Sequence, residues 1–305
     1  MEVLVDSDLE TLATELYVTT DDLLKAHPEH LPDRPRVGFV PGISDAELIT
    51  LSVLQALLGY TSETRWLRRV HKDFHGMFPH VPQQSGYNKR LRKLAGTMAW
   101  LVTRLGQLTS IATDDVVVVD STPVECARSR ETVKRSDLAG WAEYGYCASH
   151  SRYFWGLRLH LVCTLHGLPL GWALTGAKAD EREVATLLLT QVPALRDRPL
   201  TVIGDKNYYG RLFDADLATS GAHILRPHRK GEKPRLNTPI LKSLRQTIES
   251  INQTLKAQLD LERHGGRIIA GVCTRITQRV LALTAAIWHN DHLGRTRRSL
   301  TAYDH

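Results

Sequence analysis

Hydrophobic and polar positions follow two different periods along this chain, and the change comes near residue 110. Before it, apolar residues recur at helical spacing, and Ser44-Asp45-Ala46-Glu47 forms a capping box that opens a helix through Leu58. Further helices are predicted over Ser62 to Phe74 and from Ser85 to Leu105. The first hundred residues therefore predict an all-helical region.

After Asp115 the pattern changes to short apolar runs, which predict strands alternating with helices. Two of the runs flank Leu165-His166-Gly167 and predict a hairpin. Asp180-Glu181-Arg182-Glu183 is a second capping box, and we interpret its acids as helix caps rather than ligands. A parallel strand after that helix gives an α/β fold with a five-stranded mixed sheet flanked by helices. The predicted strands are Val116 to Asp120, Gly156 to Thr164, Leu168 to Leu174, Leu200 to Gly204 and Ala222 to Leu225, and a helix spans Arg211 to Ala218.

Three carboxylates occupy positions that rigid elements would hold. Asp120 closes the first predicted strand, Asp205 closes a later one, and Glu249 lies within a helical pattern from Ile240 to Leu259. Both Asp side chains are expected at one edge of the sheet, because the carboxyl ends of parallel strands meet there. Two hard divalent cations about 4 Å apart, held by carboxylate oxygens, suit in-line displacement at phosphate. The pattern therefore predicts a metal site of the kind that nucleases and strand-transfer enzymes use.

Each acid also has a purely structural interpretation. Asp120 before Ser-Thr-Pro fits a turn, Asp205 fits a strand-to-helix connection, and Glu249 fits a solvated helix surface. The surroundings of Glu249 favour a functional role, because a polar stripe beside an apolar face places it on an anchored helix. The other members of this stripe, at 100° per residue, are Arg245, Asn252 and Lys256. An ordinary ion pair within the helix is the alternative for the stripe.

Taken together, these residues resemble the DDE transposases of bacterial insertion sequences. Val118 to Val124 is similar to that family's first acidic strand and Gly204 to Gly210 to its second acidic motif, which makes Glu249 the third acid. Arg245, Glu249 and Lys256 match the spacing of a signature in one large group, although Lys242 stands where that group has a Tyr. Longer stretches are similar to a smaller insertion-sequence family with a compact catalytic domain: Tyr144 to Ser149, Arg152 to His160, Leu261 to Arg267 and Ala285 to Asn290.

The resemblance implies an RNase H-like catalytic domain without a large insertion, and a metal-dependent DNA transposase. Asp120, Asp205 and Glu249 would hold two Mg²⁺ or Mn²⁺ ions. One ion would activate water for attack at the element's end and the other would stabilise the departing 3′ oxygen, before the freed 3′-OH attacks target DNA. The implied partners are terminal inverted repeats, target DNA and a second copy of the chain on paired ends. The implied DNA contacts near the acids are Lys206, Tyr208, Arg245 and Lys256.

Charge agrees with a polyanionic partner, because the chain of 305 residues carries a net charge of +6. The basic residues are clustered, on the predicted N-terminal helices and in a loop predicted over Arg226 to Pro239. Short basic helices suit phosphate or groove binding, and a helical bundle with solvated basic faces is the alternative. The DNA contacts predicted in these clusters are Arg65, Arg68, Arg69, Lys89, Arg90, Arg92, Arg229 and Lys230. Residues 126 to 154, polar and rich in Arg and Tyr, predict a DNA-facing arm or a flexible loop.

We therefore expect a helical DNA-binding region over residues 1–110, a catalytic domain over 111–295 and a C-terminal tail over 296–305. The four cysteines form no CxxC pair, which predicts reduced thiols. An acidic start and the lack of an apolar run of about 20 residues predict a cytoplasmic protein. Two other functions remain open: a non-catalytic, domesticated protein that only binds DNA ends, and an RNase H-like nuclease that cleaves without joining.

Overall fold

The computed structural model describes residues 7–33, 41–147, 151–191, 199–229, 231–232, 246–247 and 249–303. The chain divides into two compact units. Unit 1 comprises Met1–Leu105, Ala257–Gly266 and Ala270–His305, and unit 2 comprises Gly106–Lys256 and Arg267–Ile269. The sequence predicts a DNA-binding region before residue 110 and a catalytic domain after it. This division of function stays a prediction.

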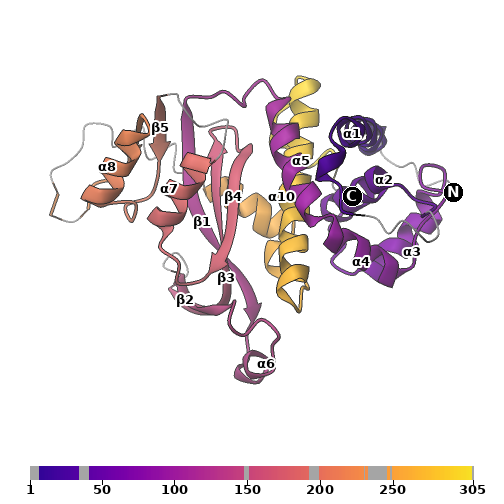
Figure 1. Ribbon diagram of the computed structural model, residues 1–305, viewed down its shortest axis with the longest axis horizontal. Coiled ribbons are helices and arrows are strands. Elements are labelled where there is room, and N and C mark those ends of the chain that lie inside the picture. Colours follow the sequence, from indigo (N-terminus) through magenta and orange to yellow (C-terminus); the bar gives the residue numbers. More distant parts are fainter. Residues whose placement is uncertain are drawn as a thin grey trace. The chain divides into compact units, whose positions relative to one another are not determined.

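Unit 1 is built from helices, as the N-terminal pattern predicts (Figure 1). The capping box at Ser44 is confirmed, since the Ser44 side chain accepts from the Glu47 amide and the Glu47 carboxylate accepts from the Ser44 amide. The single helix expected from Ser85 to Leu105 is wrong: it is two helices, separated at Leu94 just before the poor helix former Gly96. The elements are α1 (Ser7–Ala26), η1 (Pro28–His30), α2 (Asp45–Leu57), α3 (Glu63–Asp73), α4 (Gln84–Lys93), α5 (Ala95–Gln107), η5 (Leu261–Arg263) and α10 (Ile269–His292).

The core of unit 1 lies around α2 and α10, two helices that are buried around most of their circumference. Side chains from Ala46 to Leu57 on α2 are buried except Glu47, and α10 is buried from Thr274 to Asn290. No helix in the described part of the chain is long and apolar enough to cross a membrane. The two helices therefore serve as the interior of a folded unit.

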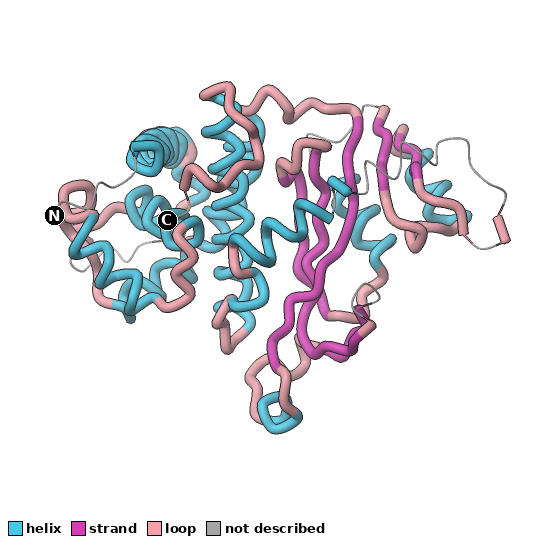
Figure 2. The backbone as a smooth tube through the Cα atoms, turned by 180° about the vertical axis from the view of Figure 1, so that it is seen from behind, coloured by secondary structure: helices cyan, strands magenta, loops and turns pink. Residues whose placement is uncertain are grey.

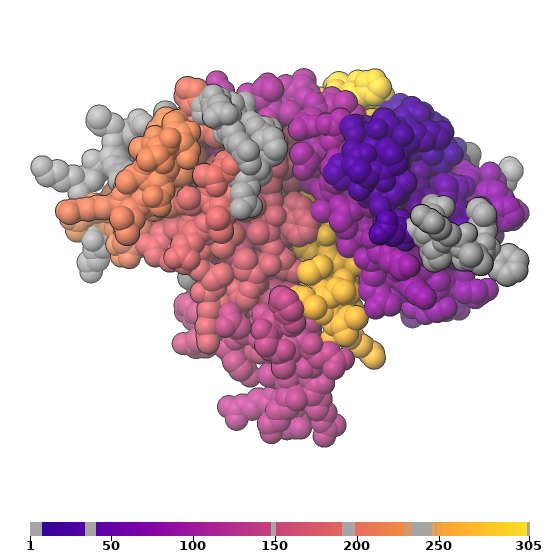
Figure 3. Space-filling model, viewed as in Figure 1, coloured from indigo at the N-terminus to yellow at the C-terminus, as the bar shows by residue number. Residues whose placement is uncertain are grey.

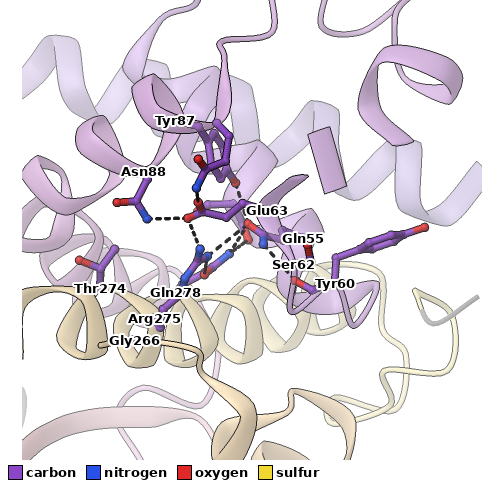
Figure 4. A network of polar contacts seen from close by, with 12 residues as sticks. Gln55, Tyr60, Ser62, Glu63, Tyr87, Asn88, Gly266, Thr274, Arg275 and Gln278 are labelled. Carbon is purple, nitrogen blue, oxygen red and sulfur yellow. Dashed lines mark hydrogen bonds and ion pairs between the residues drawn. The ribbon is translucent and has the colours of Figure 1, made fainter. Parts of the chain in front are cut away.

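A network of polar side chains crosses the interior of unit 1 (Figure 4). Glu63 on α3 forms an ion pair with Arg275 on α10 and accepts hydrogen bonds from Gln84 and Asn88, at 2.6 and 2.8 Å. Next to it, Gln55 on α2 accepts from the Tyr87 hydroxyl at 2.9 Å. Burial without partners would disfavour each of these groups, and together they satisfy one another. The network links α2, α3 and α4 to α10, which lies more than two hundred residues later in the sequence.

Unit 2 holds one mixed sheet of six strands in the order β2-β3-β1-β5-β6, with β4 also paired to β3. Figure 2 shows these strands as one curled layer. The β3–β4 hairpin and the parallel pairing of β1 with β5 confirm the mixed sheet that the sequence predicts. The strands are β1 (Val116–Ala127), β2 (Glu143–Cys147), β3 (Arg152–Thr164), β4 (Pro169–Gly176), β5 (Leu200–Ile203) and β6 (Ala222–Leu225). The helices of unit 2 include α6 (Arg130–Lys134), α7 (Glu181–Gln191), α8 (Arg211–Thr219) and the π-helical turn η4 (Thr254–Gln258).

The first strand is longer than predicted. We expected it to end at Asp120, but β1 runs on to Ala127 and pairs with β3 along its length. Ser121-Thr122-Pro123 is turn chemistry only when no partner strand is present, and here β3 supplies one on the side away from β5. Asp120 therefore lies within a strand, at the point where the parallel neighbour β5 has ended.

The stretch between β1 and β3, for which the sequence left two interpretations, forms a helix and a sixth strand. It contains α6 and then β2, which pairs with the first part of β3, from Arg152 to Gly156. A β-bulge between Glu125 and Ala127 lies opposite Gly156, where any side chain would collide with the carbonyl oxygen of Val124. The bulge and the glycine bend the sheet where this segment begins.

Candidate active site

The two aspartates meet at the carboxyl end of a parallel strand pair. The last residues in register between β1 and β5 are Val118 and Ile203. Asp120 and Asp205 each follow two residues later, so both side chains lie beyond the end of the parallel ladder. Burial raises the pKa of Asp120 most, and the negative charge of the neighbouring Asp205 raises it further. The sequence prediction that they share one edge agrees with this register.

A helix joined to Asp120 carries Glu249, the residue predicted as the third acid. Asn252 donates a hydrogen bond of 2.6 Å from its side-chain amide to Oδ2 of Asp120. Glu249 is exposed and precedes Asn252 by three residues, so the two lie on neighbouring positions of one helix face. Ile251 and Leu255 are buried and anchor this helix. The helical stripe predicted from the sequence therefore reaches the sheet through Asn252 and holds Glu249 one turn away.

Lys256 does not continue the stripe in the way its spacing predicts. It lies in the π-helical turn η4, in which the backbone is wider than an α-helix. The rotation of about 100° per residue that placed Lys256 beside Glu249 therefore does not apply over this turn. Arg245, the other cation of the stripe, lies outside the described residues.

Glu181 reaches the site from the opposite face of the sheet. It is the first residue of α7, yet its carboxylate accepts a hydrogen bond of 2.8 Å from Ser121 Oγ and forms an ion pair with Arg158. Arg158 also donates to Ser121 Oγ, at 3.0 Å. Adjacent strand residues point to opposite faces, so Ser121 places Glu181 across the sheet from the Asp120 side chain. The cap predicted at Asp180 is confirmed, since its carboxylate accepts a hydrogen bond of 2.8 Å from the Arg182 amide. Glu181 of the same box instead bonds to Ser121, and no sequence spacing indicates this contact over 60 positions.

Burial together with the neighbouring charges makes Asp120 a weaker acid than an ordinary aspartic acid. Burial, and then the charges of Asp205 and Glu181, raise the pKa of Asp120 to about 7, against hydrogen bonds from the Ser121 amide and Asn252 that lower it. Several negative groups around one half-buried carboxylate disfavour its ionised form unless a cation offsets them. The site is therefore electrostatically suited to bind a positive charge.

The raised pKa predicts how stability depends on pH in the absence of divalent metal. The folded protein binds the Asp120 proton up to about pH 7, whereas an ordinary carboxyl releases it near 3.8. Proton binding by Asp120 therefore contributes fully to the free energy of unfolding below about pH 4, and this contribution is lost as pH rises through 7. The loss is on the order of 2 kcal/mol for a half-buried group. Asp120→Asn should remove this pH dependence of the free energy of unfolding. Urea unfolding at pH 5 and pH 8 in EDTA tests this, and parallel pH dependence in both proteins would contradict it.

The donor set suits a hard divalent cation. Asp120, Asp205 and the side chain of Asn252 present carboxylate and amide groups, and Mg²⁺ and Mn²⁺ prefer such oxygen ligands. Among the described residues, no three His, Cys, Asp or Glu side chains are gathered as a complete metal-binding group. The pair of aspartates therefore forms the centre of the candidate metal site, and Glu249 as its third acid stays a prediction.

A family model of the transposase DDE domain matches residues 111–285, which is more than half of the chain. The chain belongs to this transposase family. Transposases of this family generally use divalent metal ions, in keeping with the oxygen donors at the sheet edge. The cryo-EM structure of the piggyBac transposase synaptic complex with hairpin DNA is similar at a TM-score of 0.48 and 8% identity, covering 96% of this chain and 76% of that one. The comparison with curated proteins found no match.

The tyrosines after Asp205 divide into a buried and an accessible one. Tyr208 of the transposase is 1% exposed and packs against Gly204, where a side chain would approach its ring to 3.0 Å. The DNA contact expected of Tyr208 disagrees with this burial, because its side chain is not accessible to DNA. Tyr209 is only half-buried, so part of its side chain is accessible to solvent.

Three arginines surround Tyr209. The guanidinium of Arg229 lies 3.5 Å from the centre of the Tyr209 ring, and those of Arg182 and Arg226 lie at 5.6 and 6.0 Å. Arg182 pairs with Asp180, and Arg226 pairs with Glu232. Arg229 is exposed, so its stacked cation is presented to solvent near the second acidic motif. The sequence indicated Arg229 by its charge but gave no sign of the ring beneath it.

The basic residues predicted to bind DNA through the N-terminal helices fall into two groups. Arg65, Arg68, Lys89 and Arg92 are exposed. Arg69 instead pairs with Asp73 at 2.6 Å, and Arg90 pairs with Asp45 at 2.5 Å and donates to the Ile43 carbonyl. Arg90 thus joins α4 to the start of α2, which is a structural use of a cation that the sequence assigned to DNA. Lys206, beside Asp205, is exposed, and Lys230 lies outside the described residues.

Proposed function

We propose that this protein is a DNA transposase that cleaves at the ends of an insertion sequence and joins the freed 3′ ends to target DNA as a homodimer on paired ends. Asp120, Asp205 and Glu249 are its metal-binding acids, in an RNase H-like catalytic domain. The observation that carries the proposal is the register of β1 and β5, which brings Asp120 and Asp205 together in a chain that matches the transposase DDE domain.

Asp120 and Asp205 would hold the divalent ions, with Glu249 completing the set from the helix that Asn252 joins to Asp120. Bound Mg²⁺ or Mn²⁺ supplies Lewis-acid stabilisation of the attacking and leaving oxygens. Asn252 keeps the Asp120 carboxylate in one orientation through its donated hydrogen bond. Ser121, Glu181 and Arg158 fix the strand segment around Asp120 from the opposite face. The protein's own part in catalysis is thus to hold its carboxylates in place before DNA arrives.

The DNA strand next to the acids has cations available for its phosphates. Lys206 and Arg229 are exposed, and Arg229 is held in place by stacking on Tyr209. A planar guanidinium fixed in this way suits bidentate contact with a phosphate. Lys256 and Arg245, which the sequence assigned to phosphate contact, would add to this set. These residues would orient the backbone of the strand rather than read its bases.

Product analysis tests the proposal directly. The purified protein would be incubated with Mg²⁺, labelled DNA that flanks its own gene, and unlabelled target DNA. A transposase gives strand cleavage at the element's ends and covalently joined donor and target strands. Cleaved but unjoined strands would instead favour the RNase H-like nuclease, and binding without cleavage would favour a domesticated protein that only occupies DNA ends.

The exposed cations of the N-terminal helices give a separate prediction. Arg65→Ala with Arg68→Ala should weaken binding to duplex DNA and reduce the slope of log affinity against log salt by about 0.9 for each phosphate that the protein no longer neutralises. Fluorescence anisotropy over a series of salt concentrations measures both effects. Lys25→Ala serves as the control, because Lys25 is an exposed cation on α1 that pairs with Asp21. Equal slopes in the double variant and the control would exclude these arginines from the interface.

A further inference from the structure

Exposed aromatic side chains gather in one segment of unit 2. Trp141, Tyr144, Tyr146 and Tyr153 are 59%, 53%, 49% and 77% exposed. No other aromatic side chain in the described part of the chain is exposed to this degree. All four belong to the segment formed by residues 126–147 and 151–155, which we call the aromatic lobe. Figure 3 shows residues of this segment projecting from the rest of unit 2.

Strand pairing sets three of these rings on one face. Tyr144 and Tyr146 are alternate residues of β2, and Tyr146 lies opposite Tyr153 on β3. The Tyr146 and Tyr153 rings are in contact, with their centres 5.1 Å apart. Neighbouring tyrosines on a sheet usually form part of a core, yet these face solvent. Their arrangement provides a row of flat apolar surfaces held in place by the sheet.

This row lies on the same face of the sheet as Asp120. Asp120 pairs with Leu161 on β3, and Leu161 and Tyr153 are eight residues apart, so their side chains point to the same side. At about 3.3 Å per residue, the distance along β3 is about 26 Å. Because β3 is paired throughout, one rigid element joins the aspartate to the tyrosines. The side chains between them on this face, among them Leu157, Leu159 and Leu161, are buried, so a DNA strand bound at Asp120 would pass beside this covered part of the face, and about eight base steps is the shortest path to the tyrosines.

The charge of the aromatic lobe favours a polyanion. Its exposed cations are Arg128, Arg130, Lys134 and Arg135, against the exposed acids Glu131 and Asp137. The acid next to the lobe, Glu125, has a side chain only 9% exposed and is paired with both Arg128 and Arg152. Exposed cations therefore outnumber exposed acids in the lobe that carries the aromatic row, although Lys134 is paired with Glu131. Aromatic rings within a basic surface are the usual composition of sites that bind single-stranded nucleic acid.

We propose that the aromatic lobe binds unpaired bases of the DNA strand whose phosphate lies at Asp120, by stacking them on Tyr144, Tyr146 and Tyr153. This inference rests on the proposed function, because it takes the acids as the place of cleavage. Stacking is worth about 1–3 kcal/mol per base and needs no particular base, since every base has a flat face. The lobe would thus hold a melted end of the element without reading its sequence.

The test measures affinity in EDTA for a fluorescein-labelled 12-nucleotide oligothymidine and for a 12-base-pair duplex. Tyr144→Ala with Tyr153→Ala should weaken oligothymidine binding at least about 10-fold, because two stacking partners are removed. Tyr144→Phe with Tyr153→Phe should retain it, since the rings remain. Leu212→Ala is the control, because Leu212 is 82% exposed on α8 of the same unit. Circular dichroism melting verifies that each variant is folded.

Three results would overturn the inference: unchanged oligothymidine affinity in the alanine variant, equal loss in the phenylalanine variant, or a change confined to self-association in sedimentation. The last would make the surface an interface with a second copy of the chain. Strand joining by the wild-type protein is measured separately. If the wild type does not join strands but the alanine variant loses oligothymidine binding, only the transposase function is contradicted. If the wild type joins strands and the alanine variant binds oligothymidine as well as the wild type does, only the stacking surface is contradicted.

Discussion

Replacing Asp120 with asparagine is expected to reduce DNA strand cleavage by this transposase by on the order of 10² to 10³-fold or more, while DNA binding in EDTA is unchanged. The amide retains an oxygen that can accept the hydrogen bond from Asn252. It does not carry the negative charge that a hard divalent cation requires. A gel assay with labelled end DNA and Mg²⁺ measures cleavage, and fluorescence anisotropy measures binding. Glu249→Gln should have the same effect if Glu249 is the third acid.

Asp216→Asn is the matched control, because Asp216 is an exposed carboxylate on α8 of the same unit. It should cleave at the wild-type rate. Asp120→Asn is also expected to be at least as stable as the wild type at pH 8 without metal, so loss of cleavage would not result from unfolding. If Asp120→Asn cleaves DNA at the wild-type rate in Mg²⁺, Asp120 is not part of the active site. If Glu249→Gln cleaves at the wild-type rate, another residue is the third ligand.

Removing one partner of the buried Glu63–Arg275 ion pair is expected to destabilise unit 1 strongly. The two side chains are 7% and 11% exposed, and Arg275→Ala would leave the Glu63 charge without its cation in a buried position. Loss of one partner from such a pair costs about 3–5 kcal/mol, because the remaining charge stays desolvated. For a protein of this size the melting temperature should fall by on the order of 10 °C. Scanning calorimetry measures the change.

Lys134→Ala is the control for this prediction. Lys134 and Glu131 form an ion pair at 3.3 Å, but both side chains are exposed, at 71% and 67%. Such surface pairs contribute about 0–1 kcal/mol, so the melting temperature should change little. If Arg275→Ala melts at the same temperature as Lys134→Ala, the Gln84 and Asn88 amides that donate to Glu63 satisfy its charge without the arginine.

Local signals predicted the elements that depend on neighbouring residues in the chain. The capping box at Ser44 and the hairpin around Gly167 are examples, since each is specified by a few adjacent side chains. The same signals failed where a distant partner decides the outcome. Residues 121–127 continue β1 because β3 pairs with them, and β2 is a strand because β3 offers it an edge. Propensity alone does not specify such pairing.

The sequence by itself determined the family of this protein and its candidate acids: an acid after each of two apolar runs, a third on a helical stripe, and motifs similar to those of DDE transposases. It did so because residue type and local spacing are sufficient to specify them. Only the tertiary structure decided which side chains surround Asp120, namely Asp205, Asn252 and, across the sheet, Glu181. It also buried Tyr208 and left Tyr144, Tyr146 and Tyr153 exposed. The physical reason is that burial and charge coupling depend on strand register and packing between residues far apart in sequence.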